Sequence, residues 1–258
     1  MTDREGSRTA VITAAGSGIG RVIAESLAAD GFRIWATDID VKRLGTLPGS
    51  WQRSCVDAAD PDGMTELFLK VASQWGRLDV LCANAGIAGP TAGIETIDPQ
   101  DWRRCVAVNL EGSFLAARGA APLMKRQRSG VMIFTASTAG LFGYPNRSPY
   151  AAAKWGVIGL MKTLAMELGP YGVRANAVCP GAVEGSRMER VLEREAQIKG
   201  ATRDRIYQGY ASGSSMGRWV TAQDVAEAVR FLASDAARFV SGVVLPVDGH
   251  TENPDPKV

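Results

Sequence analysis

Short apolar runs alternate with longer amphipathic segments along most of the 258-residue chain. The apolar runs lie at residues 9–13, 32–38, 53–57, 78–84, 130–137, 173–179 and 242–248. Segments with helical character lie between them, at about 19–30, 61–75, 99–127, 149–168 and 222–234. Strands that are apolar almost throughout and alternate with helices are typical of a parallel sheet with helices on both faces. The pattern therefore predicts an α/β fold in a single domain over residues 1–258.

One segment interrupts this alternation, at about residues 184–217 between the sixth and seventh apolar runs. It is polar and helix-forming, ends in ASGSSMG, and is too long for a simple crossover. Long insertions at the carboxyl edge of such a sheet commonly cover a binding site. We therefore expect 184–217 to cover the substrate, and we expect the tail TENPDPKV to be frayed.

A glycine-rich loop follows the first predicted strand, where TAAGSGIG places Gly16, Gly18 and Gly20. Glycine permits a tight turn and a close approach of a pyrophosphate to the helix N-terminus, where free N–H groups and the helix dipole favour an anion. The strict G-x-G-x-x-G pattern is absent, because Arg21 occupies its last position. The loop alone is also compatible with a glycine-rich turn that binds nothing.

Asp38 ends the second predicted strand. A carboxylate there can accept hydrogen bonds from both ribose hydroxyls of adenosine and would repel a 2′-phosphate. Ser17 in the loop, and the lack of Arg or Lys directly after Asp38, also favour NAD over NADP. The alternative is that Asp38 is only a turn or helix-cap residue.

Tyr150 and Lys154 lie four residues apart in SPYAAAKWGVIGL. Ser148 suits an N-cap and Pro149 the first helical position, so both side chains should share one face of a helix. The pKa of a free tyrosine is about 10, and lowering it by about 3 units needs roughly 4 kcal/mol from nearby positive charge. With such help the phenol could act as an acid/base, although a Tyr–Lys pair alone is more often a surface pair. Ser137, at the end of the fifth strand, could hold a substrate oxygen or simply satisfy loop backbone.

Several stretches, taken together and in their order along the chain, resemble the short-chain dehydrogenase/reductase family. They are TAAGSGIG, NAG at 84–86, VAVNLEGSF, STAG, YAAAK and NAVCPG at 176–181. The resemblance covers nearly the whole chain and implies a Rossmann-like, doubly wound sheet of about seven parallel strands. It implies a catalytic tetrad of Asn109, Ser137, Tyr150 and Lys154, in which Tyr150 is the acid/base and Lys154 lowers its pKa. Ser137 would hold the substrate oxygen, and Asn109 would hold a water that links Lys154 to solvent.

The resemblance also implies a set of residues that bind the cofactor, NAD. They are Gly16, Ser17, Gly18, Ile19, Gly20, Asp38, Asp57, Asn84, Ala85, Gly86, Tyr150, Lys154, Pro180, Gly181 and Val183. Asn84 equally suits a role in bracing the sheet. Two positions depart from the family pattern: Ala14 replaces its first loop glycine, and the threonine that usually follows Val183 is missing, with Ser186 as a possible substitute.

The substrate is the least defined part of the prediction. Arg147, just before Tyr150, and Arg187, in the covering segment, are candidates for gripping a carboxylate, sulfonate or phosphate. The mixed charges of the segment are also those of an ordinary solvated helix. Trp155, in the Tyr–Lys helix, is expected to be packed in the interior.

Composition narrows the class of protein. A net charge of +2 gives no basis for nucleic-acid or membrane binding, no apolar run is long enough for a membrane span, and the start of the chain lacks a signal peptide. The four cysteines have no metal-binding spacing and suit reduced thiols, so a cytoplasmic protein without a metal is expected. The favoured function is an NAD-dependent dehydrogenase of a secondary alcohol or ketone.

Two alternatives to this function are a 3-oxoacyl-carrier-protein or acyl-CoA reductase of the same fold, and a non-catalytic nucleotide-binding sensor or scaffold. By resemblance, the protein is expected to form a homotetramer, or a homodimer, through the helices over 99–127 and 149–168 and the C-terminal strand.

Overall fold

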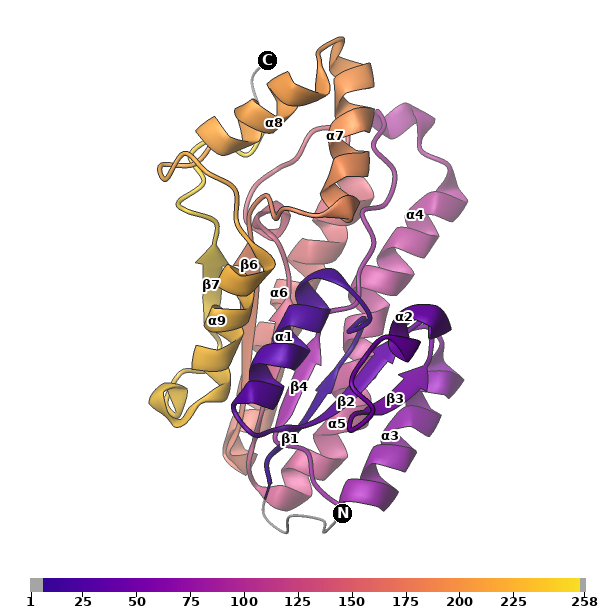
Figure 1. Cartoon of the computed structure of the whole chain (residues 1–258), viewed down its shortest axis with the longest axis vertical. Coiled ribbons are helices and arrows are strands. Elements are labelled where there is room, and N and C mark those ends of the chain that lie inside the picture. The colour runs from indigo at the N-terminus through magenta and orange to yellow at the C-terminus, as the bar shows by residue number, and fades with distance from the viewer. Residues whose placement is uncertain (1–6, 256–258) are drawn as a thin grey trace.

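A computed structural model describes residues 7–255, so the two ends of the predicted domain, 1–6 and 256–258, lie outside the described residues. Within 7–255 the chain forms one seven-stranded sheet in which every strand pair is parallel (Figure 1). The strands are β1 (Thr9–Ile12), β2 (Arg33–Asp38), β3 (Gln52–Cys55), β4 (Val80–Ala83), β5 (Gly130–Thr135), β6 (Val173–Pro180) and β7 (Val244–Val247). The predicted sheet is confirmed, with most strands somewhat shorter than their apolar runs.

The strand order is β3-β2-β1-β4-β5-β6-β7. The chain winds outward from β1 to β3 and then crosses back to β4 on the other side of β1. In open parallel sheets, ligands bind outside the carboxyl ends of the strands at the point where the order reverses. That point here lies between β1 and β4.

Successive side chains of the central strands enter two separate cores. Val11 packs in the core on one face, with Leu81 and Phe134, whereas Ile12 packs in the core on the other, with Ile133. Helices α3 (Pro61–Trp75), α5 (Gly112–Gln127) and α6 (Ser148–Leu168) cover the first face, and α1 (Gly18–Ala29) and α9 (Ala222–Ala233) cover the second. This two-sided burial explains why the strands are apolar throughout rather than alternating.

The predicted single helix over 99–127 contains a change of helix type. It consists of α4 (Pro99–Val106), a π-helical turn η2 (Ala107–Glu111) and α5. A π turn inserts one extra residue into a helix and is frequent at functional sites. The hydrophobic pattern continues across the turn, so the sequence pattern did not reveal it.

The segment at 184–217 forms two helices, α7 (Ser186–Lys199) and α8 (Arg203–Ser212), which lie beyond the carboxyl end of the sheet (Figure 1). Their apolar side chains make a small third core around Leu192 and Trp219. The adjoining tail is not frayed where it is described. Glu252 N donates to Gly213 O at 2.9 Å, and Lys199 Nζ donates to Asp255 Oδ1 at 2.6 Å.

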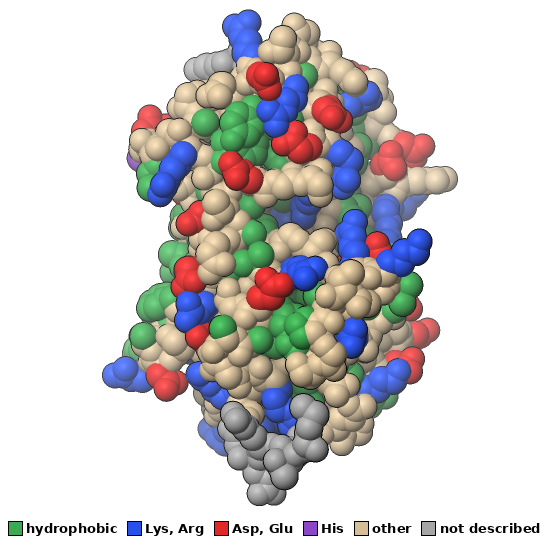
Figure 2. All heavy atoms as spheres, viewed as in Figure 1, with side chains coloured by type: hydrophobic (Ala, Val, Ile, Leu, Met, Phe, Trp, Pro, Cys, Tyr) green, Lys and Arg blue, Asp and Glu red, His purple; other side chains and the backbone are tan. Residues whose placement is uncertain are grey.

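Acidic and basic side chains are interspersed on the face drawn in Figure 2, as expected for the small net charge. Over residues 7–255, no helix combines the length and the hydropathy that a membrane crossing requires. The prediction that Trp155 is packed inside is wrong, because 52% of its surface is exposed on α6.

Candidate active site

The turn from β1 to α1 keeps the helix N-terminus open. Ser17 is the N-cap of α1 but makes no side-chain cap hydrogen bond, so its side chain satisfies none of the first-turn N–H groups. Gly18 has a φ of +55°, which favours glycine, and a Cβ added there would meet nothing within 4 Å. A free helix end with open space before it fits a pyrophosphate. Ala14 also adopts a left-handed conformation, with a φ of 51°.

Asp38 lies directly beside this loop. Its side chain is buried, Gly16 N donates to Oδ2 at 3.0 Å, and Asp40 N donates to Oδ1 at 2.9 Å. A Cβ at position 16 would lie 2.7 Å from Oδ2, so only glycine fits. The helix-cap alternative for Asp38 is wrong, because Asp40 caps α2 (Val41–Gly45) instead.

Sequence reasoning missed Arg43, which lies above the same loop. Its Nη1 donates to Ser17 Oγ at 3.1 Å, and its Nε lies 3.2 Å from Asp40 Oδ2. The sequence analysis considered only the position directly after Asp38, whereas the turn of α2 brings Arg43 back to the loop. A cation therefore lies near the carboxylate that was expected to select NAD.

Asn84 and Ala85 brace the strands that carry the site. Their backbone N–H groups both donate to Thr13 Oγ1 at 2.9 Å, and Thr135 Oγ1 donates to Asn84 Oδ1 at 3.1 Å. These bonds join the carboxyl ends of β1, β4 and β5. The bracing role of Asn84, one of the two alternatives, agrees with these contacts.

The remaining predicted cofactor residues frame the same edge of the sheet. Asp57 accepts hydrogen bonds from Ala59 N at 2.9 Å and Arg104 Nη2 at 2.8 Å. Gly181, after Pro180 at the end of β6, donates its N–H to Val247 O at 3.0 Å. Val183 pairs with Val220, and Ile19 packs in the same core.

Tyr150 and Lys154 project from the first turns of α6. Lys154 is buried and its Nζ donates to Thr135 O at 2.8 Å, so the ammonium is fixed at the end of β5. Its Nζ lies 5.6 Å from the centre of the Tyr150 ring. The prediction that Ser148 caps α6 is wrong: the helix begins at Ser148, Arg147 is the N-cap, and the buried Ser148 hydroxyl has no partner among residues 7–255.

Burial and nearby positive charge act on the pKa of Tyr150 in opposite directions. Burial raises the pKa of Tyr150, but the positive charges of Lys154, Arg187 and Arg147 and the hydroxyl of Ser137 lower it, and the net shift is downward. Burial also lowers the pKa of Lys154, an effect that the Tyr150 phenolate opposes. A phenol with a lowered pKa is a better base near neutral pH than free tyrosine.

Asn109 lies in the π turn, fully buried beside Gly86. Its Nδ2 donates to Ile87 O at 3.0 Å and Cys105 O at 2.9 Å, whereas its Oδ1 has no partner among the described residues. A Cβ added to Gly86 would lie 2.6 Å from this Oδ1 and 3.5 Å from Lys154 Nζ. A buried acceptor without a partner, close to an ammonium, fits a site for a bound water.

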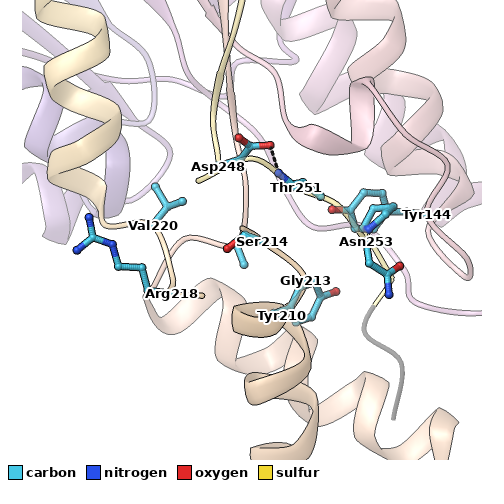
Figure 3. A pocket seen from close by; sticks show the side chains of 11 residues that line it. Tyr144, Tyr210, Gly213, Ser214, Arg218, Val220, Asp248, Thr251 and Asn253 are labelled. Carbon is cyan, nitrogen blue, oxygen red and sulfur yellow. Dashed lines mark hydrogen bonds between the residues drawn. The ribbon is translucent and has the colours of Figure 1, made fainter. Parts of the chain in front are cut away.

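A small cavity lies between α8 and the segment after β7 (Figure 3). Its walls include Tyr144, Tyr210, Ser214 and Asp248, and Figure 3 marks the hydrogen bond from Thr251 N to Asp248. Its volume of about 20 Å³ suits one water molecule rather than a substrate. Among residues 7–255, no group of three or more potential metal ligands occurs.

Tyr150 and the fixed Lys154 ammonium lie at the carboxyl edge of a sheet whose strand order is typical of dinucleotide-binding folds, an arrangement that suits a nicotinamide-dependent oxidoreductase. Comparison with known proteins agrees with that class. A family model described as Enoyl-(Acyl carrier protein) reductase matches residues 13–250.

Three relatives show how far the similarity extends. The chain is 34% identical to 3-oxoacyl-(acyl-carrier-protein) reductase FabG of Thermotoga maritima, over 94% of this chain and 96% of that protein. It is 36% identical to cis-4-hydroxycyclohexanecarboxylate dehydrogenase of Sinomonas cyclohexanicum, over 96% and 98%. Carveol dehydrogenase from Mycobacterium avium, solved in complex with NAD, matches with a TM-score of 0.89 and 31% identity, over 96% and 99%.

The chain belongs to the short-chain dehydrogenase/reductase family, as its motifs indicated. It is an oxidoreductase that transfers hydride between a nicotinamide cofactor and the carbinol or carbonyl carbon of a secondary alcohol or ketone.

Proposed function

We propose that Tyr150, Lys154, Ser137 and Asn109 form the catalytic site of an NAD-dependent alcohol dehydrogenase or ketone reductase. The observation that carries this proposal is geometric: Lys154 is fixed by its hydrogen bond to Thr135 O, with its Nζ 5.6 Å from the centre of the Tyr150 ring. The downward shift in the pKa of Tyr150 agrees with this arrangement.

In alcohol oxidation, Tyr150 accepts the proton of the substrate hydroxyl, and Ser137 holds the same oxygen in place. NAD, when bound, accepts the hydride from the carbinol carbon. Lys154 stabilises the Tyr150 phenolate before the transfer, which lowers the free energy needed to form the base. In ketone reduction the proton moves the other way, from Tyr150 to the substrate oxygen.

The proton then leaves the site through a relay. Asn109 Oδ1 can accept a hydrogen bond from a water, which in turn can accept one from the Lys154 ammonium. Oδ1 has no hydrogen-bond partner among residues 7–255 and lies across Gly86 from Lys154, and both observations support this role. Asn109 would thus act by holding water and not by touching the substrate.

The preferred cofactor is NAD, held by Gly16, Ser17, Gly18, Ile19 and Gly20 at the helix end. Asp38 would accept the ribose hydroxyls, and the remaining residues frame the adenine and nicotinamide sides; they are Asp57, Asn84, Ala85, Gly86, Pro180, Gly181 and Val183. Arg43 lies beside the loop and could favour the 2′-phosphate of NADP, so the preference for NAD needs a direct measurement. Dissociation constants for NADH and NADPH, from quenching of tryptophan fluorescence, test it directly.

The substrate class is proposed as a secondary alcohol or ketone covered by residues 184–217. The second candidate is a 3-oxoacyl thioester, which is favoured by the relative from Thermotoga maritima and by the description of the matching family model. The buried carboxylate of Asp38 argues for NAD, whereas we expect a reductase of that kind to use NADP. To separate the two candidate functions, the rate with NADPH and a 3-oxoacyl thioester is compared with the rate with NAD and secondary alcohols.

The protein is proposed to be a cytoplasmic homotetramer, with a homodimer as the alternative. Phe114 on α5 and Trp155 on α6 are 45% and 52% exposed, so both are available for a contact between copies. All four cysteines are free thiols, which suits a reducing compartment. Light scattering after size exclusion measures the assembly, and Trp155→Lys should reduce its mass.

The decisive experiment for the function follows cofactor absorbance with a panel of secondary alcohols and ketones. Wild-type protein should turn over at least one member, and Tyr150→Phe should lose at least about 100-fold in kcat while keeping its affinity for NAD, because proton transfer contributes about 10²–10⁴-fold. Turnover unaffected by the substitution would refute the role of Tyr150. No turnover by the wild type, with intact NAD binding, would favour the non-catalytic sensor or scaffold.

A further inference from the structure

Three cations surround the Tyr150 ring. Lys154 Nζ lies 5.6 Å from the ring centre, and the guanidinium carbons of Arg147 and Arg187 lie 4.9 Å and 5.9 Å from it. The carboxylate paired with this group is that of Glu195, on α7, at 4.0 Å from Arg147 Nη1. Three positive charges against one negative charge leave the site electropositive.

Two of the three cations are already occupied. Lys154 is buried, donates to Thr135 O and lies beside the phenol. Arg147 is 6% exposed, donates to Ala88 O at 3.1 Å and faces Glu195, which accepts a hydrogen bond from Tyr210 at 2.7 Å. Arg147 is therefore buried, and two of its contacts are to groups of the protein itself, although its Nε has no partner among residues 7–255. We expect it to be less accessible to a substrate anion than an exposed arginine.

Arg187 differs from both. It is exposed in the first turn of α7, and among residues 7–255 it has no carboxylate partner. Its one hydrogen bond is to the Tyr150 hydroxyl, at 3.5 Å from Nη2. Glu189, two residues further along α7, pairs with Arg203 at 2.6 Å and so does not neutralise Arg187. A guanidinium offers five N–H donors, so most of its donors are free.

The position of Arg187 restricts what it can bind. A reacting substrate oxygen must lie within about 2.6–3.2 Å of the Tyr150 hydroxyl. Arg187 Nη2 lies 3.5 Å from that same hydroxyl, so it reaches groups within a few bonds of the carbinol carbon. Since Arg147 is paired with Glu195, a single free guanidinium suits a monoanion, and its planar fork matches a carboxylate.

We propose that Arg187 is the substrate's anion receptor, and that the substrate is a hydroxy acid or the corresponding oxo acid. This inference rests on the proposed function and adds the substrate class to it. A charge-assisted bond of this kind should favour the acid over a neutral analogue by about 10- to 100-fold in kcat/KM.

The test uses 2-, 3- and 4-hydroxy acids, each paired with its methyl ester, and follows NADH formation. For wild type, at least one acid should exceed its ester by about 10-fold or more. Arg187→Met should bring that ratio close to one, and Arg187→Lys should restore part of it. Arg190→Met is the matched control, because Arg190 is an exposed arginine of the same helix and should leave the ratio unchanged.

The outcomes separate this inference from the function beneath it. Two results would overturn the role of Arg187 and leave the proposed dehydrogenase function standing. In the first, esters or neutral alcohols react as well as the acids; in the second, the preference for the acid survives in Arg187→Met. A hydroxyalkyl phosphate that outperforms every acid would overturn the carboxylate. Failure of every acid, ester and neutral alcohol with both cofactors would reject the proposed function, and this inference with it.

Discussion

Replacing Gly86 with alanine should impair catalysis and lower the stability of the protein. A Cβ there would lie 2.6 Å from Asn109 Oδ1, and such atoms hardly ever approach within 3.0 Å, so the amide must move by at least 0.4 Å. Asn109 is fully buried and held by two backbone carbonyls, so this movement disturbs the π turn. Overpacking of this kind costs about 1–3 kcal/mol, partly offset by about 0.4–1 kcal/mol from the less flexible unfolded chain.

The activity should fall further than the stability implies. The methyl group would fill the space between Asn109 Oδ1 and Lys154 Nζ, where we place the relay water. Small displacements of groups at a reacting centre lower the rate by up to about 100-fold, so kcat should fall by roughly 10- to 100-fold.

Steady-state kinetics and a thermal melt of the same preparations measure both effects. Gly49→Ala serves as the matched control, because a Cβ there meets nothing within 4 Å and the residue is exposed far from the site. Wild-type kcat in Gly86→Ala would show that the space beside Asn109 plays no part in proton transfer. If Gly49→Ala lost as much kcat as Gly86→Ala, the loss would be a general effect of replacing glycine with alanine.

Three more results are expected. Ala14→Gly should raise the melting temperature by about 1–4 °C, because relief of the left-handed conformation (about 1–2 kcal/mol) exceeds the added entropy of the unfolded chain; a lower melting temperature would contradict this. Asp38→Ser should reduce kcat/KM with NAD by about 10- to 100-fold and raise kcat/KM with NADP, since Arg43 lies beside the loop. An unchanged ratio of kcat/KM with NAD to kcat/KM with NADP would remove the role of Asp38. Because the Tyr150 phenolate is the base and its pKa is lowered, kcat/KM for alcohol oxidation should rise with pH and level off below pH 10; a profile still rising at pH 10 would count against the lowered pKa.

The parts of the fold that depend on local pattern were predictable. Apolar runs marked the central strands because both faces of the sheet are buried there, whereas the edge strand β3 is polar and mostly exposed. The position of Lys154 relative to Tyr150 followed from helical spacing alone. Glycine at 16, 18 and 20 marked the turn, since the approach of Asp38 at position 16 allows no side chain.

Features that depend on contacts distant in the sequence were not predictable. The π turn at Asn109 leaves the apolar pattern unbroken, so the sequence showed a plain helix. Arg147 and Glu195 lie 48 positions apart, and their contact depends on where α7 lies relative to the start of α6. Arg43 was overlooked for a similar reason, because its contact with Ser17 requires the turn made by α2.

The segment after β7 is hydrogen-bonded to the segment after α8, which affects where a tag can be attached to the protein. Residues 249–253 exchange backbone hydrogen bonds with 213–216, directly after α8, and Asp255 is tied to Lys199 at the end of α7. A purification tag or fusion partner added at the carboxyl end would thus act on α7 and α8 through these bonds. The described chain begins at residue 7, just before β1, and the amino end of β1 lies far from those two helices (Figure 1). The amino end is therefore the safer attachment point for immobilisation or for a reporter.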